Sequence, residues 1–340
     1  MGKNSHKSLR RILHRCNEEL KATKEISKVT SLGEGITTFL AKVDIQIMNH
    51  NGYKENKLFK KHLLKKHEIM LKYYEKTFDD FLEKYDFDYN LNQMGKESKY
   101  KDCIWVCWWQ GLENAPEIVK ICVDSIKKCA GNHEVIILTE DNYKDYVDIP
   151  EWVEEKRKAG IITRTNYSDL LRLSLLAKHG GMWLDSTFFC NNIDLDEYFK
   201  LPIWSIKRPD YAHNSVACGY FAGYSLYCSQ DNRWIFATIR DFFLNYWKKN
   251  DFMIDYLMVD YMIELSKRKD FRIQKEFDKI PANNKNCDEL YKVLSQVYDK
   301  KAWDRIKKDT GLFKLSWKQN YALVENGKDT FYSMVINNRL

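Results

Sequence analysis

Residues 168–187, SDLLRLSLLAKHGGMWLDST, decide the predicted fold. The first half of this stretch has apolar residues at steps of three and four, which predicts a helix packed on two sides, with Ser168 as its N-cap. Gly180-Gly181 ends this helix, because glycine tolerates the left-handed conformation. Met182–Leu184 follows as a short apolar strand. Asp185 stands at the carboxyl end of that strand, which is where α/β folds bind ligands.

Asp169 and Arg172 are three residues apart and therefore share one face of the predicted helix. Such a pair is as typical of a buried core helix that carries an ion pair as it is of a charged ligand site. The spacing alone leaves both interpretations open.

The composition is that of a globular protein with ample core. Its 340 residues support one to three domains, at about 100–200 residues each. An aromatic content of 14% indicates stacking surfaces as well as core. The net charge of +7 favours anionic partners such as nucleotides, nucleic acid or acidic lipid.

The nine cysteines have scattered spacings and no CxxC pair, so reduced thiols fit better than a disulfide framework or a zinc site. No apolar segment of the kind found in signal peptides follows Met1-Gly2-Lys3. No run approaches the roughly 20 apolar residues that a membrane span needs. We therefore expect a cytoplasmic protein, either soluble or peripheral to a membrane.

Residues 1–100 form a predicted basic, helical N-terminal region. Up to Lys76 it contains 17 Lys and Arg against 8 Asp and Glu, so the rest of the chain is slightly acidic. Apolar residues within 9–20 and 58–67 recur at helical spacing beside basic ones. Such helices can dock on an anionic membrane surface, or they can form a solvated basic bundle. Residues 86–101 are polar and are expected to be a linker.

Residues 101–340 have the pattern of an α/β domain. A strand at 103–109, a helix from 115 and a strand at 134–139 predict a βαβ unit with parallel strands. Further strands are expected at 203–206 and 216–224, and further helices at 234–247 and 252–267. Asp260 and Glu264 share a face of the last helix, which favours a solvated edge over a catalytic pair.

Several motif-defined classes are excluded. The chain has no GxGxxG after the first strand, no Walker loop, no GxSxG and no HExxH. What remains is a set of carboxylates, arginine and aromatics, which is the set that activated-sugar chemistry needs. A divalent cation neutralises a diphosphate and prefers oxygen ligands such as Asp185, an aromatic such as Trp108 holds a base, and an Asp/Arg pair fixes sugar hydroxyls.

One spaced pattern resembles the sugar-binding region that contains the DXD motif in GT-A glycosyltransferases: Ser168-Asp169-x-x-Arg172, then Gly180-Gly181-x-Trp183-x-Asp185-x-Thr187. Over residues 103–318 the chain is similar to the capsular polysaccharide synthesis protein family, to glycosyltransferase family 32 and, more distantly, to the large clostridial glucosylating toxins. The resemblance implies an α/β GT-A fold, a Rossmann-like, mixed, mostly parallel sheet flanked by helices, here preceded by the helical N-terminal region.

The resemblance also implies roles for single residues. Trp108 would stack on the nucleotide base. Asp169 and Arg172 would hold donor-sugar hydroxyls, with Arg172 also near the β-phosphate. Asp185 would bind ribose and the metal, Mn²⁺ or Mg²⁺. The second metal ligand of the motif is Thr187 here, and a hydroxyl is a poorer ligand than a carboxylate.

The C-terminal part of the resemblance lies in Lys314-Leu315-Ser316-Trp317-Lys318. Ser316 and Trp317 would close over the diphosphate, and Lys314 or Lys318 would add charge there. A plain amphipathic strand is the alternative for this segment.

The implied activity is transfer of a hexose from a nucleotide sugar, UDP-linked, to a hydroxyl of a lipid-linked surface or capsular polysaccharide. Retention of configuration is expected by family analogy; with inversion, Asp260 or another carboxylate would act as base. The acceptor and the anionic membrane surface place the protein on the inner face of the cell membrane. A non-catalytic protein with a degenerate site is the alternative. Nucleic acid is not an expected partner, because the basic helices lack interleaved aromatics.

Overall fold

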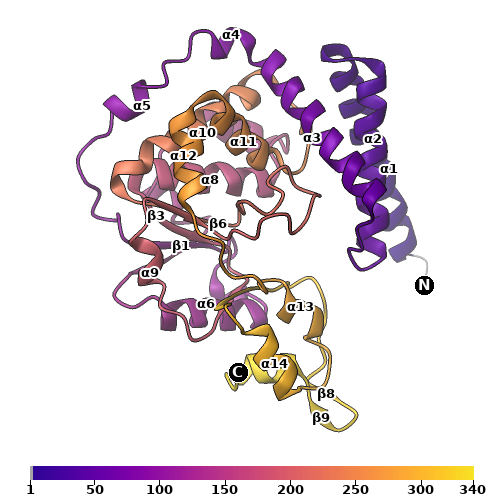
Figure 1. Cartoon of the computed structure of the whole chain (residues 1–340), viewed down its shortest axis with the longest axis vertical. Coiled ribbons are helices and arrows are strands. Elements are labelled where there is room, and N and C mark those ends of the chain that lie inside the picture. Colours follow the sequence, from indigo (N-terminus) through magenta and orange to yellow (C-terminus); the bar gives the residue numbers. More distant parts are fainter. Residues whose placement is uncertain (1–2) are drawn as a thin grey trace.

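The computed structural model describes residues 3–340, with side chains described from Cys16 onward. The apolar stripe expected within residues 9–20 therefore lies mostly outside the described side chains. Three long helices form the N-terminal region and pack side by side at one flank of the molecule (Figure 1): α1 (Lys3–Val29), α2 (Leu32–His50) and α3 (Lys57–Thr77). Ser31 and Asn56 cap α2 and α3, since each side chain accepts a hydrogen bond from a first-turn amide.

A long connection leads from α3 around the α/β part of the chain (Figure 1). It contains two single-turn helices, α4 (Asp79–Leu82) and α5 (Tyr89–Asn92). The second of these lies inside the linker expected at residues 86–101, so that segment is mostly turns but not wholly irregular.

The central sheet has five strands in the order β2-β1-β3-β6-β5. Their bounds are β1 (Ile104–Cys107), β2 (Val135–Leu138), β3 (Gly181–Leu184), β5 (Ile203–Ser205) and β6 (Ser225–Cys228). β1 pairs in parallel with β2 and β3, whereas β6 is antiparallel to both of its neighbours, so four of the five strands run in the same direction. This confirms the mixed, mostly parallel sheet and the βαβ unit.

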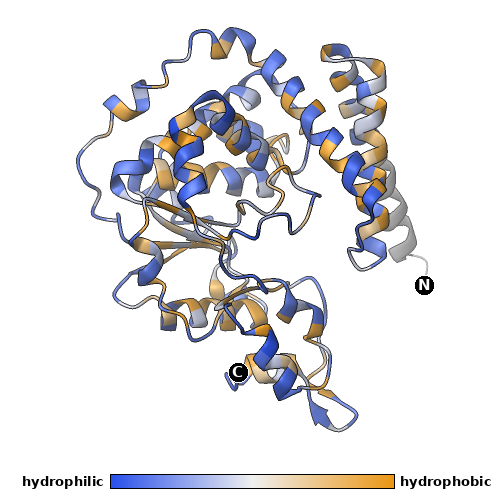
Figure 2. Ribbon diagram, viewed as in Figure 1, coloured by the Kyte–Doolittle hydropathy of each residue, from blue (hydrophilic) through white to orange (hydrophobic). Residues whose placement is uncertain are grey.

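Helices cover both faces of the sheet. The flanking helices are α6 (Glu117–Cys129), α8 (Arg164–His179), α10 (Arg233–Lys249), α11 (Met258–Lys269) and α12 (Phe271–Lys279). In Figure 1, the helix labelled α6 lies on one side of the sheet, and those labelled α8, α10, α11 and α12 lie on the other. The central strands are predominantly apolar (Figure 2), as buried strands of a parallel arrangement are.

The remaining elements are short. They comprise the helices α7 (Glu151–Lys158), α9 (Asp196–Phe199), α13 (Glu289–Val293), α14 (Lys300–Ile306) and α15 (Phe331–Ile336), the paired strands β4 (Phe188–Cys190) and β7 (Leu312–Lys314), the hairpin β8 (Val324–Glu325) and β9 (Lys328–Asp329), and the 3₁₀ turns η1 (Leu112–Asn114), η2 (Tyr143–Asp145) and η3 (Gln230–Asn232). The β4–β7 pair joins the C-terminal segment to the chain just beyond β3.

Three local predictions were wrong in part or in full. The helix expected at 252–267 begins only at Met258, because residues 252–257 form bends and turns. Residues 216–224 are not a strand, because Cys218 and Gly219 both have positive φ and the Arg208 amide donates to the Gly219 carbonyl, which reverses the chain. Ser168 is not the N-cap of α8. Thr163 caps that helix instead. The prediction was wrong because the first turn of the helix is polar and does not share the apolar periodicity. Ser168 lies within the helix, where its hydroxyl donates to the Arg164 carbonyl.

The N-terminal region shares the main core. Ile69, Met70 and Tyr74 of α3 are buried in the same apolar cluster as the sheet. A buried ion pair adds to this contact, with 2.8 Å between Lys66 Nζ and Asp255 Oδ2. The boundary proposed near residue 100 stays a prediction. No helix in the described part of the chain combines the length and apolar character needed to cross a membrane.

Candidate functional site

The double glycine fixes where Asp185 emerges from the sheet. Gly180 and Gly181 have φ values of +71° and +81°. A Cβ on Gly181 would lie 2.4 Å from the Cys103 carbonyl oxygen, so only glycine lets β3 enter the sheet beside β1. The predicted helix stop is therefore confirmed, and its physical reason is backbone approach as well as conformation.

Helix α8 brings Asp169 and Arg172 to the same place. Arg172 Nη2 lies 3.3 Å from Asp169 Oδ1 and 3.6 Å from Asp185 Oδ1. The guanidinium also donates to the Gly223 carbonyl and lies 5.1 Å from the centroid of the Trp183 ring. The spacing of Asp169 and Arg172 left open a core ion pair or part of a charged site. The structure shows a buried ion pair whose arginine also lies near Asp185.

Asp185 is the accessible carboxylate of this cluster, with 29% of its side chain exposed. Its Oδ1 accepts a hydrogen bond of 3.0 Å from Trp183 Nε1, and Lys314 Nζ lies 3.3 Å from Oδ2. Burial alone would raise the pKa of Asp185, but Lys314 and Arg172 hold this pKa below its usual value. Asp185 is therefore ionised at neutral pH.

Asp169 differs from Asp185 because it is almost fully buried. Burial raises the pKa of Asp169, and the neighbouring Arg172 and a hydrogen bond from Asn166 oppose that rise only in part. Asp169 is thus suited to orienting the Arg172 guanidinium from below the accessible surface.

The C-terminal segment completes the cluster. β7 pairs antiparallel with β4, which places Lys314 opposite Phe188, and Lys314 Nζ donates to Thr187 Oγ1. The strand ends at Lys314, so Ser316 and Trp317 lie in the loop beyond it rather than in an amphipathic strand. Lys318 follows in the same loop with an exposed side chain, and its amide donates to Ser316 Oγ.

Trp108 lies directly beyond β1, and its amide donates to the Leu138 carbonyl of the neighbouring strand. The ring of Trp317 meets it edge to face, with 5.5 Å between centroids. The indole Nε1 of Trp108 is buried and has no hydrogen-bond partner among the described residues. The structure thus places Trp108 against Trp317, in the loop that follows Lys314, while Lys314 and Arg172 contact Asp185. The roles that the resemblance implies for these residues stay predictions.

Asp260 is a residue whose environment the sequence misjudged. The expected solvated edge is wrong for it: the side chain is buried, and Ser215 Oγ donates to Oδ2 at 2.6 Å. Burial raises its pKa to about 6. A Cβ on Gly223 would lie 2.9 Å from Asp260 Oδ1 and 3.6 Å from Arg172 Nη1, so both groups lie against the space beside Gly223.

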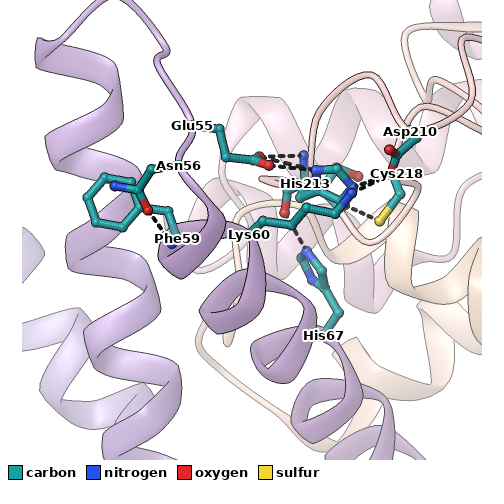
Figure 3. A network of polar contacts seen from close by, with 9 residues as sticks. Glu55, Asn56, Phe59, Lys60, His67, Asp210, His213 and Cys218 are labelled. Atoms are coloured by element: carbon teal, nitrogen blue, oxygen red, sulfur yellow. Dashed lines mark hydrogen bonds and ion pairs between the residues drawn. The ribbon is translucent and has the colours of Figure 1, made fainter.

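The loop that carries Ser215 and Gly223 is anchored to α3 through a polar network (Figure 3). His213 lies between two carboxylates, 2.8 Å from Glu55 Oε1 and 2.7 Å from Asp210 Oδ1. The backbone carbonyl of His213 lies 2.8 Å from His67 Nε2. The N-terminal region thus helps to hold the loop that borders the cluster.

The two predicted ligands of Mn²⁺ or Mg²⁺, Asp185 and Thr187, offer one carboxylate and one hydroxyl. No group of three or more His, Cys, Asp or Glu side chains that could hold a metal occurs among the described residues. The predicted ligands are engaged by cations, since Lys314 contacts both Asp185 Oδ2 and Thr187 Oγ1, and Arg172 lies near Asp185 Oδ1. Mg²⁺ in nucleotide sites is bound through one or two carboxylates together with substrate phosphates, and here the one accessible carboxylate, Asp185, is already paired with two cations.

The sequence profile of capsular polysaccharide synthesis proteins matches residues 50–335. A solved structure, the apo form of the bifunctional glycosyltransferase WbbM, aligns with 9% identity and a TM-score of 0.38, over 72% of this chain and 52% of that one. The chain thus corresponds to about half of that protein's length. No curated protein matches the sequence. Because the profile covers most of the chain and confirms the predicted resemblance, the protein belongs to the capsular polysaccharide synthesis protein family.

Proposed function

We propose that the protein is a glycosyltransferase of capsular or surface polysaccharide synthesis. It transfers a hexose from a UDP-linked donor to a hydroxyl of a lipid-linked glycan. The observation that carries this proposal is the convergence of Arg172 and Lys314 on the two oxygens of Asp185, at the carboxyl end of β3. Family membership supports the setting in polysaccharide synthesis.

The two cations suit a diphosphate. Arg172 presents a fixed guanidinium fork and Lys314 a partly exposed ammonium, and both can donate to phosphate oxygens. Asp185 holds both cations in place and is accessible to a ribose or sugar hydroxyl. Trp108 and Trp317 supply the aromatic surface for the base.

The transfer breaks the bond between the sugar C1 and the β-phosphate oxygen, and the electron pair leaves with the nucleoside diphosphate. The acceptor hydroxyl oxygen forms the new bond to C1. With retention, its proton passes to the departing phosphate oxygen. Asp260 is buried and accepts a hydrogen bond from Ser215, which argues against a direct role as base towards an acceptor hydroxyl.

The test is to incubate the protein with a panel of nucleotide sugars and an extract of lipid-linked glycans, and to follow nucleoside diphosphate release. Asp185→Ala is expected to lower turnover about 100-fold, in the range of a lost electrostatic contact. Asp304→Ala removes a carboxylate that pairs with Lys300 on the surface of α14 and serves as the control. Unchanged turnover of Asp185→Ala would overturn the site, and absence of binding to every nucleotide sugar would overturn the enzyme proposal.

A second candidate is a non-catalytic protein that binds nucleotide sugar or partner enzymes at the membrane. The observation that favours it is Thr187 in place of the second acidic residue of the DXD pattern, with its hydroxyl engaged by Lys314. Calorimetric binding of a nucleotide sugar with no turnover on any acceptor would favour this candidate.

We also propose that the N-terminal region docks on an anionic membrane surface, at the inner face of the cell membrane. The described structure shows an apolar stripe on the outward side of α2, whose members are 39% to 69% exposed: Leu32, Ile36, Leu40, Val43 and Ile47. Their spacing of three and four residues puts them on one side of the helix, while Gly35, Thr38, Ala41 and Met48 are buried on the other.

Charge supports a lipid surface as the partner of this stripe. Residues 1–76 carry an excess of nine positive charges. The excess lies outside α2, which has one lysine against two acidic residues, so it would act through the neighbouring helices on an anionic lipid surface. Such docking would bring the site close to a lipid-linked acceptor. Nucleic acid is not proposed as a partner.

A further inference from the structure

We propose that the ammonium of Lys314 takes the position of the divalent cation in the donor site, so that this enzyme neutralises the leaving diphosphate without a metal. This inference rests on the proposed function and specifies how its site handles charge. It follows from the disagreement between the expected metal and the donors present.

The first observation is position. Lys314 Nζ lies 3.3 Å from Asp185 Oδ2 and donates to Thr187 Oγ1. These are the two residues of the DXD-like triplet that would have held the metal. A positive charge therefore already lies between the two side chains at which the family pattern puts an ion.

The second observation is that the lysine is held in place. The Lys314 amide donates to the Cys287 carbonyl, and the next amide donates to the Thr187 carbonyl, each at 2.9 Å. The ammonium lies 5.7 Å from the Phe188 ring centroid and 5.6 Å from that of Tyr224. A cation fixed in advance costs little reorganisation when charge develops on a leaving group.

The third observation is competition for the same oxygen atoms. A Mg²⁺ or Mn²⁺ ligand lies roughly 2.0–2.2 Å from the ion, so an ion on Asp185 Oδ2 would lie within a few ångströms of Lys314 Nζ. Two cations at that separation repel strongly where solvent is partly excluded. Thr187 also offers a neutral hydroxyl instead of the second carboxylate that would offset this repulsion.

The accessible face of the lysine points to its role. Lys314 keeps 22% of its side chain exposed, against 9% for Arg172, so it is the more available cation for a diphosphate. As the bond between C1 and the phosphate oxygen breaks, the electron pair stays on that oxygen and a Lys314 N–H donates to it. The lysine stays protonated throughout, and nothing is oxidised or reduced.

The experiment measures binding of UDP and of uridine by calorimetry, in EDTA and in Mg²⁺ or Mn²⁺, with GDP and CDP in parallel. Wild type is expected to bind one nucleoside diphosphate with an affinity that changes less than twofold between EDTA and metal. Lys314→Met should weaken that binding at least tenfold and leave nucleoside binding unchanged, whereas Lys314→Arg retains most of it. Lys308→Met, which removes an exposed lysine of the same C-terminal segment, is the matched control.

Thermal unfolding of each variant checks that loss of binding is not loss of fold. If Lys314→Met does not fold, the comparison of EDTA with metal on wild type and on Lys314→Arg still decides the question. Binding or turnover that requires Mg²⁺ or Mn²⁺ overturns the inference and leaves the proposed function standing. Absence of nucleotide binding with and without metal overturns both.

Discussion

Trp108 and Trp317 meet edge to face, with 5.5 Å between ring centroids and an interplanar angle of 87°. One ring follows β1 at the start of the α/β part of the chain, and the other follows β7 near its end. Trp108 is half-buried, whereas 46% of Trp317 is exposed. The contact thus joins a half-buried ring to a more accessible one, which follows Lys314 by three residues in the chain.

Trp317→Ala is expected to weaken nucleotide binding about tenfold or more, in line with the free energy of stacking a base on an aromatic ring. The free energy of unfolding should change little, because the side chain is half-exposed. Calorimetry with the nucleotide that wild type binds measures the first effect and chemical denaturation the second. Trp317→Phe keeps a ring at this position and should bind nearly as wild type; equal affinity of the alanine variant would contradict the role of the loop.

Asp260 predicts a pH dependence of stability. Burial raises its pKa to about 6 in the folded protein, from an ordinary value near 3.8. The stabilising contribution of the protonated carboxyl is therefore full below about pH 4 and is lost as pH rises through 6, a loss of about 3 kcal/mol. Asp260→Asn removes this titration. Chemical denaturation at pH 4 and pH 7 measures this effect. The free energy of unfolding of Asp260→Asn relative to that of wild type should be higher at pH 7 than at pH 4. If the free energies of both proteins change with pH in the same way, the assignment is contradicted.

Lys66 and Asp255 form a buried ion pair that ties α3 to the α/β part of the chain. Burial lowers the pKa of Lys66, and the neighbouring Lys66 keeps the pKa of Asp255 below its usual value despite burial. Asp255→Asn leaves the ammonium buried and unpaired, and should lower the free energy of unfolding by about 3–5 kcal/mol.

The double variant Lys66→Met/Asp255→Asn should be more stable than Asp255→Asn, because no unpaired charge remains inside. Lys200→Met, which breaks an exposed ion pair with Glu197, is the control and should lower the free energy of unfolding by less than about 1 kcal/mol. Chemical denaturation gives all three values. A double variant no more stable than the single one would show that the pair is not isolated from its neighbours.

The apolar stripe of α2 predicts binding to lipid. Wild type should sediment with vesicles that contain anionic phospholipid and much less with neutral ones. Ile36→Glu/Leu40→Glu puts two negative charges on the stripe and is expected to reduce sedimentation at least tenfold. Phe271→Glu, at an exposed apolar residue on α12, is the control.

The oligomeric state of the same variants separates a membrane from a protein partner. If the stripe is instead a surface between two copies of the chain, wild type elutes as a dimer and Ile36→Glu/Leu40→Glu as a monomer. If wild type and Ile36→Glu/Leu40→Glu then bind vesicles equally, the stripe is a dimer surface and docking on lipid is contradicted.

Local signals determined much of the fold. The apolar runs at 103–109 and 134–139 and the helix between them specified the parallel βαβ unit, because each element has its own periodicity and boundary residues. Gly180-Gly181 and the apolar residues after it located the end of α8 and the start of β3. The strand expected at 216–224 failed because an apolar composition does not reveal successive positive φ angles.

The candidate site also contains one part that local sequence predicted and one part that it did not. The spacing of Asp169 and Arg172 was enough to predict that they share one helix face, whereas only the family resemblance put Asp185 in the same site. Contacts between distant segments were beyond local pattern. From the sequence, either Lys314 or Lys318 could add charge near the diphosphate. The β4–β7 register shows that Lys314 is the one in contact with Asp185 and Thr187.

The burial of Asp260 also could not be predicted from local sequence. Its helical position was predicted, but whether a carboxylate faces water depends on what packs over it, here Gly223 and Ser215 from a distant loop. The sequence by itself determined the helix, the glycine turn and the carboxylate at the end of β3, because neighbouring residues dictate them. Only the tertiary structure decided which cation faces that carboxylate, because strand register and long-range packing bring it there.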